Sequence, residues 1–134
     1  MSKEIIVNSA KTALLFIFSA VFSLAMAGEV KLYDQKTFDK LAQDGKPVLL
    51  AIHATWCPTC KAQKPIINEL MGQSAYKEVT TLMIDFDTNK PMLQKYKVPK
   101  QSTLIAFKGV KEVGRSVADT THDGIESLIR KTLN

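Results

Sequence analysis

Cys57 and Cys60 are the residues of this sequence whose types and spacing point most directly to chemistry. They are its two cysteines, and Pro58 and Thr59 separate them. Two sulfurs this close in the chain form a disulfide and exchange it with other thiols, because a thiolate attacks a disulfide sulfur through a mixed-disulfide intermediate. A structural disulfide gains most when it closes a long loop, and two intervening residues offer little of that. The spacing therefore predicts a reactive pair rather than a structural cross-link.

The residues on either side of the pair predict a strand followed directly by a helix. Val48–Ala54 is a nearly continuous apolar run, which is typical of a strand buried on both faces. A helix is expected from Thr59 onward, with Pro58 in its first turn, where no backbone N–H is needed. Cys57 would then lie at the helix N-terminus, where unpaired N–H groups and the helix dipole favour a thiolate. Cys60, one turn further on, could attack the resulting mixed disulfide and release the reduced partner, and the reverse sequence would donate a disulfide.

Two other uses of the same cysteines remain open from the residues alone. The pair could be half of a zinc site, which needs about four ligands. His53 and His122 are the two histidines, and they lack a paired ligand spacing, so no residue is assigned as a metal ligand. The alternatives are a metal-binding or metal-delivery module and a non-catalytic interaction domain. No cofactor is expected, because no glycine-rich phosphate loop is present and the cysteines themselves transfer the electrons.

The spacing of apolar residues predicts an α/β domain with the element order βαβαβαββα. Strands are expected at Val30–Tyr33, Val48–Ala54, Val79–Phe86, Thr103–Phe107 and Glu112–Val117. Helices are expected at Lys36–Gln43, from Thr59 onward with a kink at Pro65, at Pro91–Tyr96, and after a cap at Thr120 or Thr121. The last helix would present a stripe of Ile125, Leu128, Ile129 and Leu133. Helices would cover both faces of a central mixed β-sheet.

Residues 1–27 have the features of a signal peptide. The stretch has a mildly basic start, an uncharged apolar run at Thr12–Met26 and a small-residue cleavage pattern at Ala25-Met26-Ala27. The apolar run is shorter than the roughly 20 residues that span a membrane. Cleavage after Ala27 is expected, with an uncleaved membrane anchor as the alternative. The predicted domain is therefore residues 28–134, exported to a periplasm or a similar oxidising compartment.

The distribution of charge argues against a nucleic-acid partner. The formal net charge is +5, but the lysines are scattered and no basic stripe with interleaved aromatic residues is present. The charge is therefore interpreted as a solvated surface. A monomer is expected, since the sequence shows no obvious exposed apolar seam.

The residues around the cysteines resemble those of the thioredoxin superfamily. The resembling features are Trp56-Cys57-Pro58-Thr59-Cys60-Lys61 after an apolar strand, Pro65 in the following helix, Leu82-Met83-Ile84-Asp85 in a central strand, and Lys108-Gly109 in the last hairpin. The resemblance covers almost all of residues 28–134 and implies the thioredoxin fold. It also implies a thiol-disulfide oxidoreductase in which Cys57 is the nucleophile and Cys60 is the resolving cysteine.

The chain departs from ordinary thioredoxins at positions that assist proton transfer. The family carries a buried aspartate in the strand before the motif and a lysine near it, and the matching residues here are Ala51 and Thr81. By this resemblance, water or His53 would move the proton of the resolving cysteine instead. These absences, and Pro-Thr in place of the Gly-Pro between the cysteines, point away from a housekeeping reductase.

A second departure concerns the cis-proline of the family, which faces the cysteines. Alignment places Ser102 at that position, and Gln101 at the preceding one, which pairs with the substrate backbone. Because a cis bond costs a non-proline residue about 2.5–4 kcal/mol, we expect a trans Gln101–Ser102 bond or a rebuilt loop. The alternative is a cis Val98–Pro99 bond in a longer loop. Two hypotheses follow: Ser102 Oγ donates a hydrogen bond to the Cys57 thiolate, or the missing ring leaves room for a metal at the sulfurs.

The expected partners are client proteins with thiols or disulfides. Trp56 and Pro58 would line a shallow apolar contact surface for them, and Gln101 and Ser102 complete the predicted substrate-binding set. A redox partner is also needed, either a membrane electron donor for a reductase or a disulfide source for an oxidase. The sequence does not choose between these two directions.

Overall fold

The computed structural model describes residues 27–134 of the chain. The expected signal peptide, apart from Ala27, lies outside these residues. None of the helices in residues 27–134 has the length and apolar character needed to cross a membrane.

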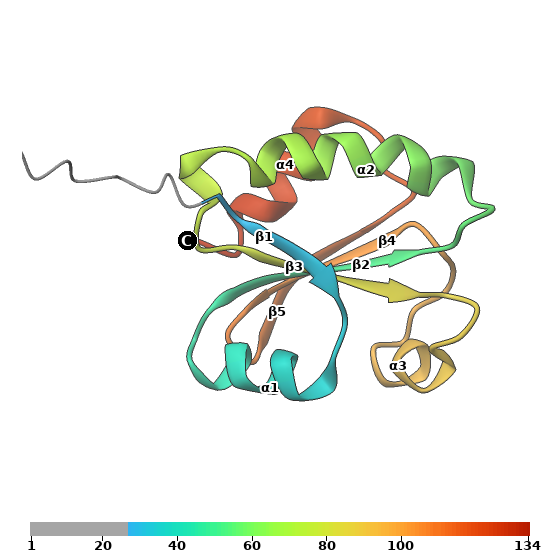
Figure 1. Ribbon diagram of the computed structural model, residues 1–134, viewed down its shortest axis with the longest axis horizontal. Helices are drawn as coiled ribbons and strands as arrows, with labels where there is room; N and C mark the ends of the chain where they lie inside the picture. The colour runs from blue at the N-terminus through green and yellow to red at the C-terminus, as the bar shows by residue number, and fades with distance from the viewer. Residues whose placement is uncertain (1–26) are drawn as a thin grey trace, which may run out of the picture.

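A five-stranded mixed β-sheet forms the middle layer of the domain (Figure 1). The strands are β1 (Glu29–Leu32), β2 (Pro47–His53), β3 (Thr80–Asp85), β4 (Thr103–Lys108) and β5 (Lys111–Val117). They lie in the order β1-β3-β2-β4-β5, with β3 parallel to both β1 and β2, and with β4 antiparallel to both β2 and β5. Strand β2 is therefore the centre of the sheet, as its continuous apolar run predicts.

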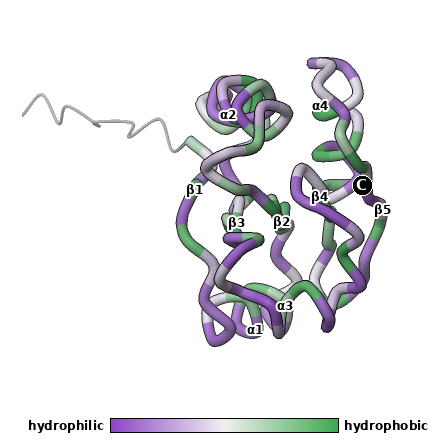
Figure 2. The backbone as a smooth tube through the Cα atoms, turned by 90° about the vertical axis from the view of Figure 1, so that its right-hand side faces the viewer, coloured by the Kyte–Doolittle hydropathy of each residue, from purple (hydrophilic) through white to green (hydrophobic). Residues whose placement is uncertain are grey.

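Helices cover both faces of this sheet. They are α1 (Gln35–Gln43), α2 (Pro58–Met71), α3 (Lys90–Lys95) and α4 (His122–Arg130), with a short 3₁₀ helix, η1 (Ser74–Tyr76), before β3. Helices α2 and α4 lie on one face, and α1 and α3 lie on the other (Figures 1 and 2). The predicted order βαβαβαββα is confirmed, with η1 as an addition.

The side chains of β2 alternate between two hydrophobic cores. Leu49 and Ala51 pack under α2 and α4, whereas Val48, Leu50 and Ile52 pack against α1 and the α3 side. All five are buried, because β2 is enclosed by strands on both edges and by helices on both faces. This enclosure fixes the end of β2, which is the point from which the cysteine-bearing segment departs.

A single capping side chain fixes the N-terminus of each of two helices. The carboxylate of Asp34 accepts the N–H of Thr37 at the start of α1, and Thr121 Oγ1 accepts the N–H of Gly124 at the start of α4. The cap at Thr121 agrees with one of the two positions predicted. The prediction that Leu133 belongs to the apolar stripe of this helix is wrong, because α4 ends at Arg130 and Leu133 lies in the turn beyond it, 40% exposed.

The hairpin between β4 and β5 depends on a glycine. Gly109 has φ +60°, and a Cβ atom there would lie 3.2 Å from the carbonyl oxygen of Ala42 and 3.2 Å from the Cα of Gly45. Gly45 has φ +69°, but a Cβ atom there would have no neighbour within 4 Å. The hairpin therefore packs closely against the turn that follows α1.

We expect Gly109→Ala to destabilise the domain more than Gly45→Ala. Both variants place alanine in the left-handed region, which costs about 1–2 kcal/mol, and only Gly109→Ala adds a crowded contact. Chemical denaturation of both variants measures the two free energies of unfolding. Equal losses would show that the contact between the two turns is not tight.

Candidate active site

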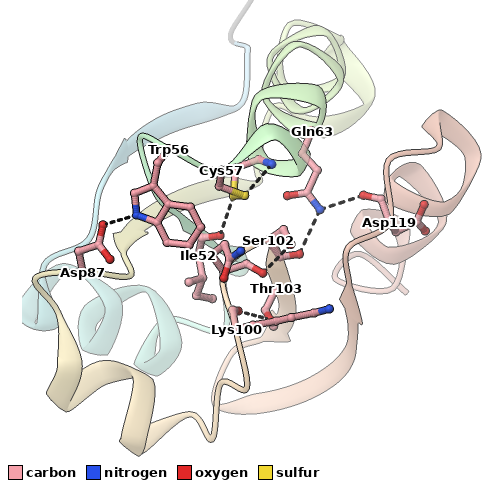
Figure 3. The surroundings of a disulfide bond; sticks show 11 residues. Ile52, Trp56, Cys57, Gln63, Asp87, Lys100, Ser102, Thr103 and Asp119 are labelled. Atoms are coloured by element: carbon pink, nitrogen blue, oxygen red, sulfur yellow. Dashed lines mark hydrogen bonds between the residues drawn. A yellow bond between two sulfur atoms is a disulfide. The ribbon is translucent and has the colours of Figure 1, made fainter.

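The two cysteines form a disulfide at the N-terminus of α2 (Figure 3). Their Cα atoms are 5.3 Å apart. Cys57 is the N-cap residue of the helix, and its Sγ accepts the backbone N–H of Cys60 at 3.0 Å. Pro58 occupies the first turn, where its missing N–H is not needed. The sulfur of Cys57 thus receives an N–H that the helix leaves unpaired, which favours a thiolate when the disulfide opens.

The disulfide is largely enclosed by protein. Cys57 is 1% exposed and Cys60 is 8% exposed. Both pack in a small cluster with Ala54 and the ring of Phe86, and Cys60 Sγ lies 3.9 Å from the carbonyl oxygen of Ile52. The sulfurs therefore lie against the carboxyl end of β2, where the predicted strand-to-helix junction places them.

Trp56 and Pro58 lie at the surface beside the disulfide. Trp56 is 54% exposed, and its Nε1–H donates to Asp87 Oδ2 at 2.8 Å (Figure 3). The indole is thereby held in one orientation while its ring remains accessible. Asp87 was not singled out from the sequence for any role at the site, and no spacing rule connects a residue before α2 with one after β3.

The loop that carries Asp87 is fixed by a neighbouring carboxylate. Asp85 Oδ1 accepts the N–H of Asp87 at 2.8 Å and the N–H of Thr88 at 2.9 Å. The hydrogen bond from the Thr88 N–H is the main reason that the pKa of Asp85 lies below its usual value, and the nearby His53 contributes as well. An ionised Asp85 therefore holds the turn that positions the partner of Trp56.

Ser102 faces the disulfide in a loop with no cis bond. No peptide bond within residues 27–134 is cis, so the trans Gln101–Ser102 bond is confirmed and the alternative of a cis Val98–Pro99 bond is wrong. Ser102 has φ +61°, a conformation open to serine because it lacks the proline ring that fixes φ near −65°. Its N–H donates to the carbonyl oxygen of Ile52 at 2.8 Å, which ties the loop to the end of β2.

The Ser102 hydroxyl makes no hydrogen bond to a sulfur in this oxidised state. It donates instead to the carbonyl oxygen of Gln101, its neighbour in the chain. Ser102 itself is 2% exposed, whereas Gln101 is half-buried. Of the two residues, Gln101 is therefore the more accessible to a bound chain.

Gln63 is a buried polar residue of the site that the sequence interpretation missed. Its Nε2 group donates to the carbonyl oxygens of Ser102 at 3.1 Å and Asp119 at 2.8 Å (Figure 3). One helical side chain thus joins α2 to the loop before β4 and to the loop before α4. Gln63 falls on the buried stripe of Cys60, Ile67 and Leu70 in α2, and a glutamine at helical spacing within an apolar stripe was the signal available in the sequence.

The positions that match the proton-transfer groups of the resembled family are buried and carry no charge. Ala51 and Thr81 are both enclosed in the core, and the hydroxyl of Thr81 has no hydrogen-bond partner. Within residues 27–134, no group of three or more histidine, cysteine or acidic side chains is placed to hold a metal ion. The two sulfurs are bonded to each other in this structure.

Comparisons with known proteins agree with this geometry. The family model described as Thioredoxin matches residues 29–131. A thioredoxin of Chlamydia trachomatis serovar D is 34% identical over 102 residues, which make up 76% of this chain and 97% of that protein. The crystal structure of Trxlp from Edwardsiella tarda EIB202 superposes with a TM-score of 0.73 at 34% identity, covering 75% of this chain and 98% of that one.

A more local similarity extends to a second kind of protein. The Yersinia pestis protein named thiol:disulfide interchange protein DsbE is 54% identical over 39 residues. That match spans 28% of this chain and 21% of the relative.

Replacing Gln63 by methionine should destabilise the domain by about 1–3 kcal/mol, because the partly buried carbonyl of Asp119 loses its donor. The carbonyl of Ser102 keeps a bond from the Ala118 N–H and should remain in place. Gln94→Met on the exposed surface of α3 is the control and should change little. Denaturant unfolding of both variants tests this, and equal stabilities would contradict a structural role for Gln63.

Proposed function

The chain belongs to the thioredoxin family, and from that premise we propose that it exchanges disulfides with exported client proteins. The chain has the thioredoxin fold, a central mixed sheet flanked by helices, and it is a thiol-disulfide oxidoreductase. Cys57 attacks the disulfide of a client, and Cys60 resolves the mixed disulfide. In the opposite direction, a client thiolate opens the Cys57–Cys60 disulfide.

The hydrogen bond from the Cys60 N–H to Cys57 Sγ is the observation that supports these roles. It gives Cys57, and not Cys60, the position that stabilises a thiolate at the start of α2. It also holds Cys60 one turn away, within bonding distance of the same sulfur. The nucleophile and the resolving group are therefore distinguished by their place on the helix.

Client chains are proposed to bind beside Cys57 along the surface formed by Trp56, Pro58 and the loop of Gln101 and Ser102. The exposed indole and Pro58 offer apolar contact area, and the indole is already oriented by Asp87. The backbone N–H and C=O of Ser102 are both used within the protein and Ser102 is buried, so the half-buried Gln101 is the residue proposed to meet the client backbone.

Export is proposed from the first 27 residues. The basic start, the apolar run and the cleavage pattern at Ala25-Met26-Ala27 together form a secretory signal. A location outside the cytoplasm also suits a protein that exchanges disulfides, because disulfides persist in oxidising compartments. The local similarity to a protein named for thiol:disulfide interchange agrees with this role.

We expect Cys60→Ser to accumulate mixed disulfides with client proteins, because the resolving sulfur is missing. Cys57→Ser, the matched control, should accumulate few or none. Non-reducing electrophoresis of cells that produce each variant, followed by identification of the trapped partners, makes the comparison. Equal trapping by the two variants would contradict the assignment of Cys57 as nucleophile.

The reduction potential of the pair decides the direction of electron flow. A value near about −270 mV would indicate a reductase, and one near about −120 mV a disulfide donor. Equilibration of the protein with glutathione and dithiothreitol buffers gives this value. Absence of a reversible dithiol couple would exclude the proposed function.

The exported protein should begin at Gly28. N-terminal sequencing of protein recovered from an extracytoplasmic fraction checks this expectation. Recovery of the full chain in the membrane fraction would indicate an uncleaved anchor instead, and recovery from the cytoplasm would contradict export.

A further inference from the structure

A cavity of about 530 Å³ adjoins the resolving cysteine. It lies between α2 and the part of the sheet formed by β1, β3 and β2, and its lining includes Cys60 and His53. Ile67 of α2 and Met83 of β3 contribute apolar walls. The cavity therefore brings the only histidine of the sheet to the same space as the sulfur that must lose a proton before it attacks.

The alternation of side chains along β2 explains why His53 faces this cavity. Leu49 and Ala51 point to the α2 side of the sheet, and Ile52 points to the opposite core. His53 is the next residue in the alternation and so lies on the α2 side, at the carboxyl end of the strand. It is half-buried, so its side chain borders the cavity and is also accessible to solvent.

Cys60 needs a proton acceptor because its thiol is poorly placed to ionise alone. Burial against apolar groups disfavours a thiolate, and Cys60 packs with Ala54 and Phe86. The strand positions beneath it offer no acid or base, since Ala51 is apolar and Thr81 does not titrate. An imidazole takes up and releases a proton between about pH 5 and 8, the range in which this exchange would operate.

The charged groups around His53 come from three elements. Lys31 of β1 and Lys61 and Lys64 of α2 line the same cavity. Asp85 of β3 is the register partner of His53 and is the acidic residue among these neighbours. The charge of His53 is one of the influences that lower the pKa of Asp85, which indicates that the two side chains interact.

We propose that His53 moves the proton of Cys60 through the cavity beside α2, in place of the carboxylate found in ordinary thioredoxins. This inference rests on the proposed function, since it assigns a role within the same exchange. The cavity is large enough to hold water between the imidazole and the thiol. His53 is therefore a proton-transfer residue of the second step, and the first attack by Cys57 does not require it.

In the direction of client reduction, Cys60 resolves the mixed disulfide between Cys57 and the client. The Cys60 thiol gives its proton to His53, and the Cys60 sulfur attacks the Cys57 sulfur of the mixed disulfide. The Cys57–Cys60 bond forms, the bond from Cys57 to the client sulfur breaks, and the client sulfur leaves with the electron pair as a thiolate. The client has then gained two electrons, the cysteine pair has lost two, and the proton on His53 returns to solvent.

Single-turnover reaction with dithiobis(nitrobenzoate) separates the two steps. Attack by Cys57 on this reagent releases one coloured thiolate, and resolution by Cys60 releases a second. Stopped-flow absorbance of the reduced full chain between about pH 5 and 9 would give both rates for the wild type and for His53→Gln. His122→Gln, at the exposed start of α4, is the matched histidine control.

For His53→Gln we expect the second release to slow by about 100-fold near neutral pH, the lower end of what a positioned general base contributes. Its rate should then rise only as an unassisted thiol ionises, toward about pH 8.5 and above. The first release should keep its wild-type rate, and His122→Gln should leave both rates unchanged.

Other results would overturn the inference in distinguishable ways. An unchanged second rate and pH profile in His53→Gln would remove His53 from the step, and the proposed function would stand. Equal slowing of both releases, or equal slowing by His122→Gln, would show a general structural effect and overturn the role. A wild-type protein that never releases the second thiolate would overturn the proposed function and this inference together.

Discussion

The hydrogen bond between the Cys60 N–H and the Cys57 sulfur is the contact on which the site depends. It makes Cys57 both the cap of α2 and the end of the segment that leaves β2. A helix cap satisfies one of the N–H groups that the first turn leaves unpaired, so the same contact stabilises the fold and lowers the free energy of the reactive thiolate. The chemistry and the start of the helix therefore cannot be separated by mutation of this sulfur alone.

The loop beside the disulfide is held by a set of hydrogen bonds and not by the rigid ring of a proline. Where related proteins have a proline, Ser102 lies in a trans loop with positive φ and is bonded to Ile52 and to Gln63. Gln63 also reaches Asp119, so α2, the loop before β4 and the loop before α4 are joined through one amide. The loop that faces the sulfurs is thus held by donors and acceptors from distant segments, which fixes its backbone without the restriction that proline imposes.

Much of the fold follows from local patterns in the sequence. The apolar run of β2 predicts the central strand, because a short strand enclosed on both faces is typically apolar throughout, and the adjoining Cys57 and Pro58 predict the start of α2. The last helix shows the limit of this reasoning. Leu133 continues the helical spacing, yet the helix stops at Arg130, and spacing alone does not mark where a helix ends.

The contacts that complete the site depend on tertiary structure and were not predictable in the same way. Gln63 lies 39 residues from Ser102 and 56 from Asp119 in the chain, and Trp56 lies 31 from Asp87. Such pairs are set by how the layers pack, so no local pattern identifies them. The positive φ of Ser102 belongs to the same class, because a serine gives no local signal for that conformation.

The position of Trp56 gives the protein an intrinsic optical signal. It is the single tryptophan of the chain, and its ring lies beside the disulfide, oriented by Asp87 (Figure 3). A disulfide accepts an electron from an excited indole far more readily than a dithiol does, so oxidation and reduction of the pair alter the emission of one fluorophore with no other tryptophan to obscure the change. The fluorescence of Trp56 therefore reports the redox state of the two sulfurs in the unlabelled protein.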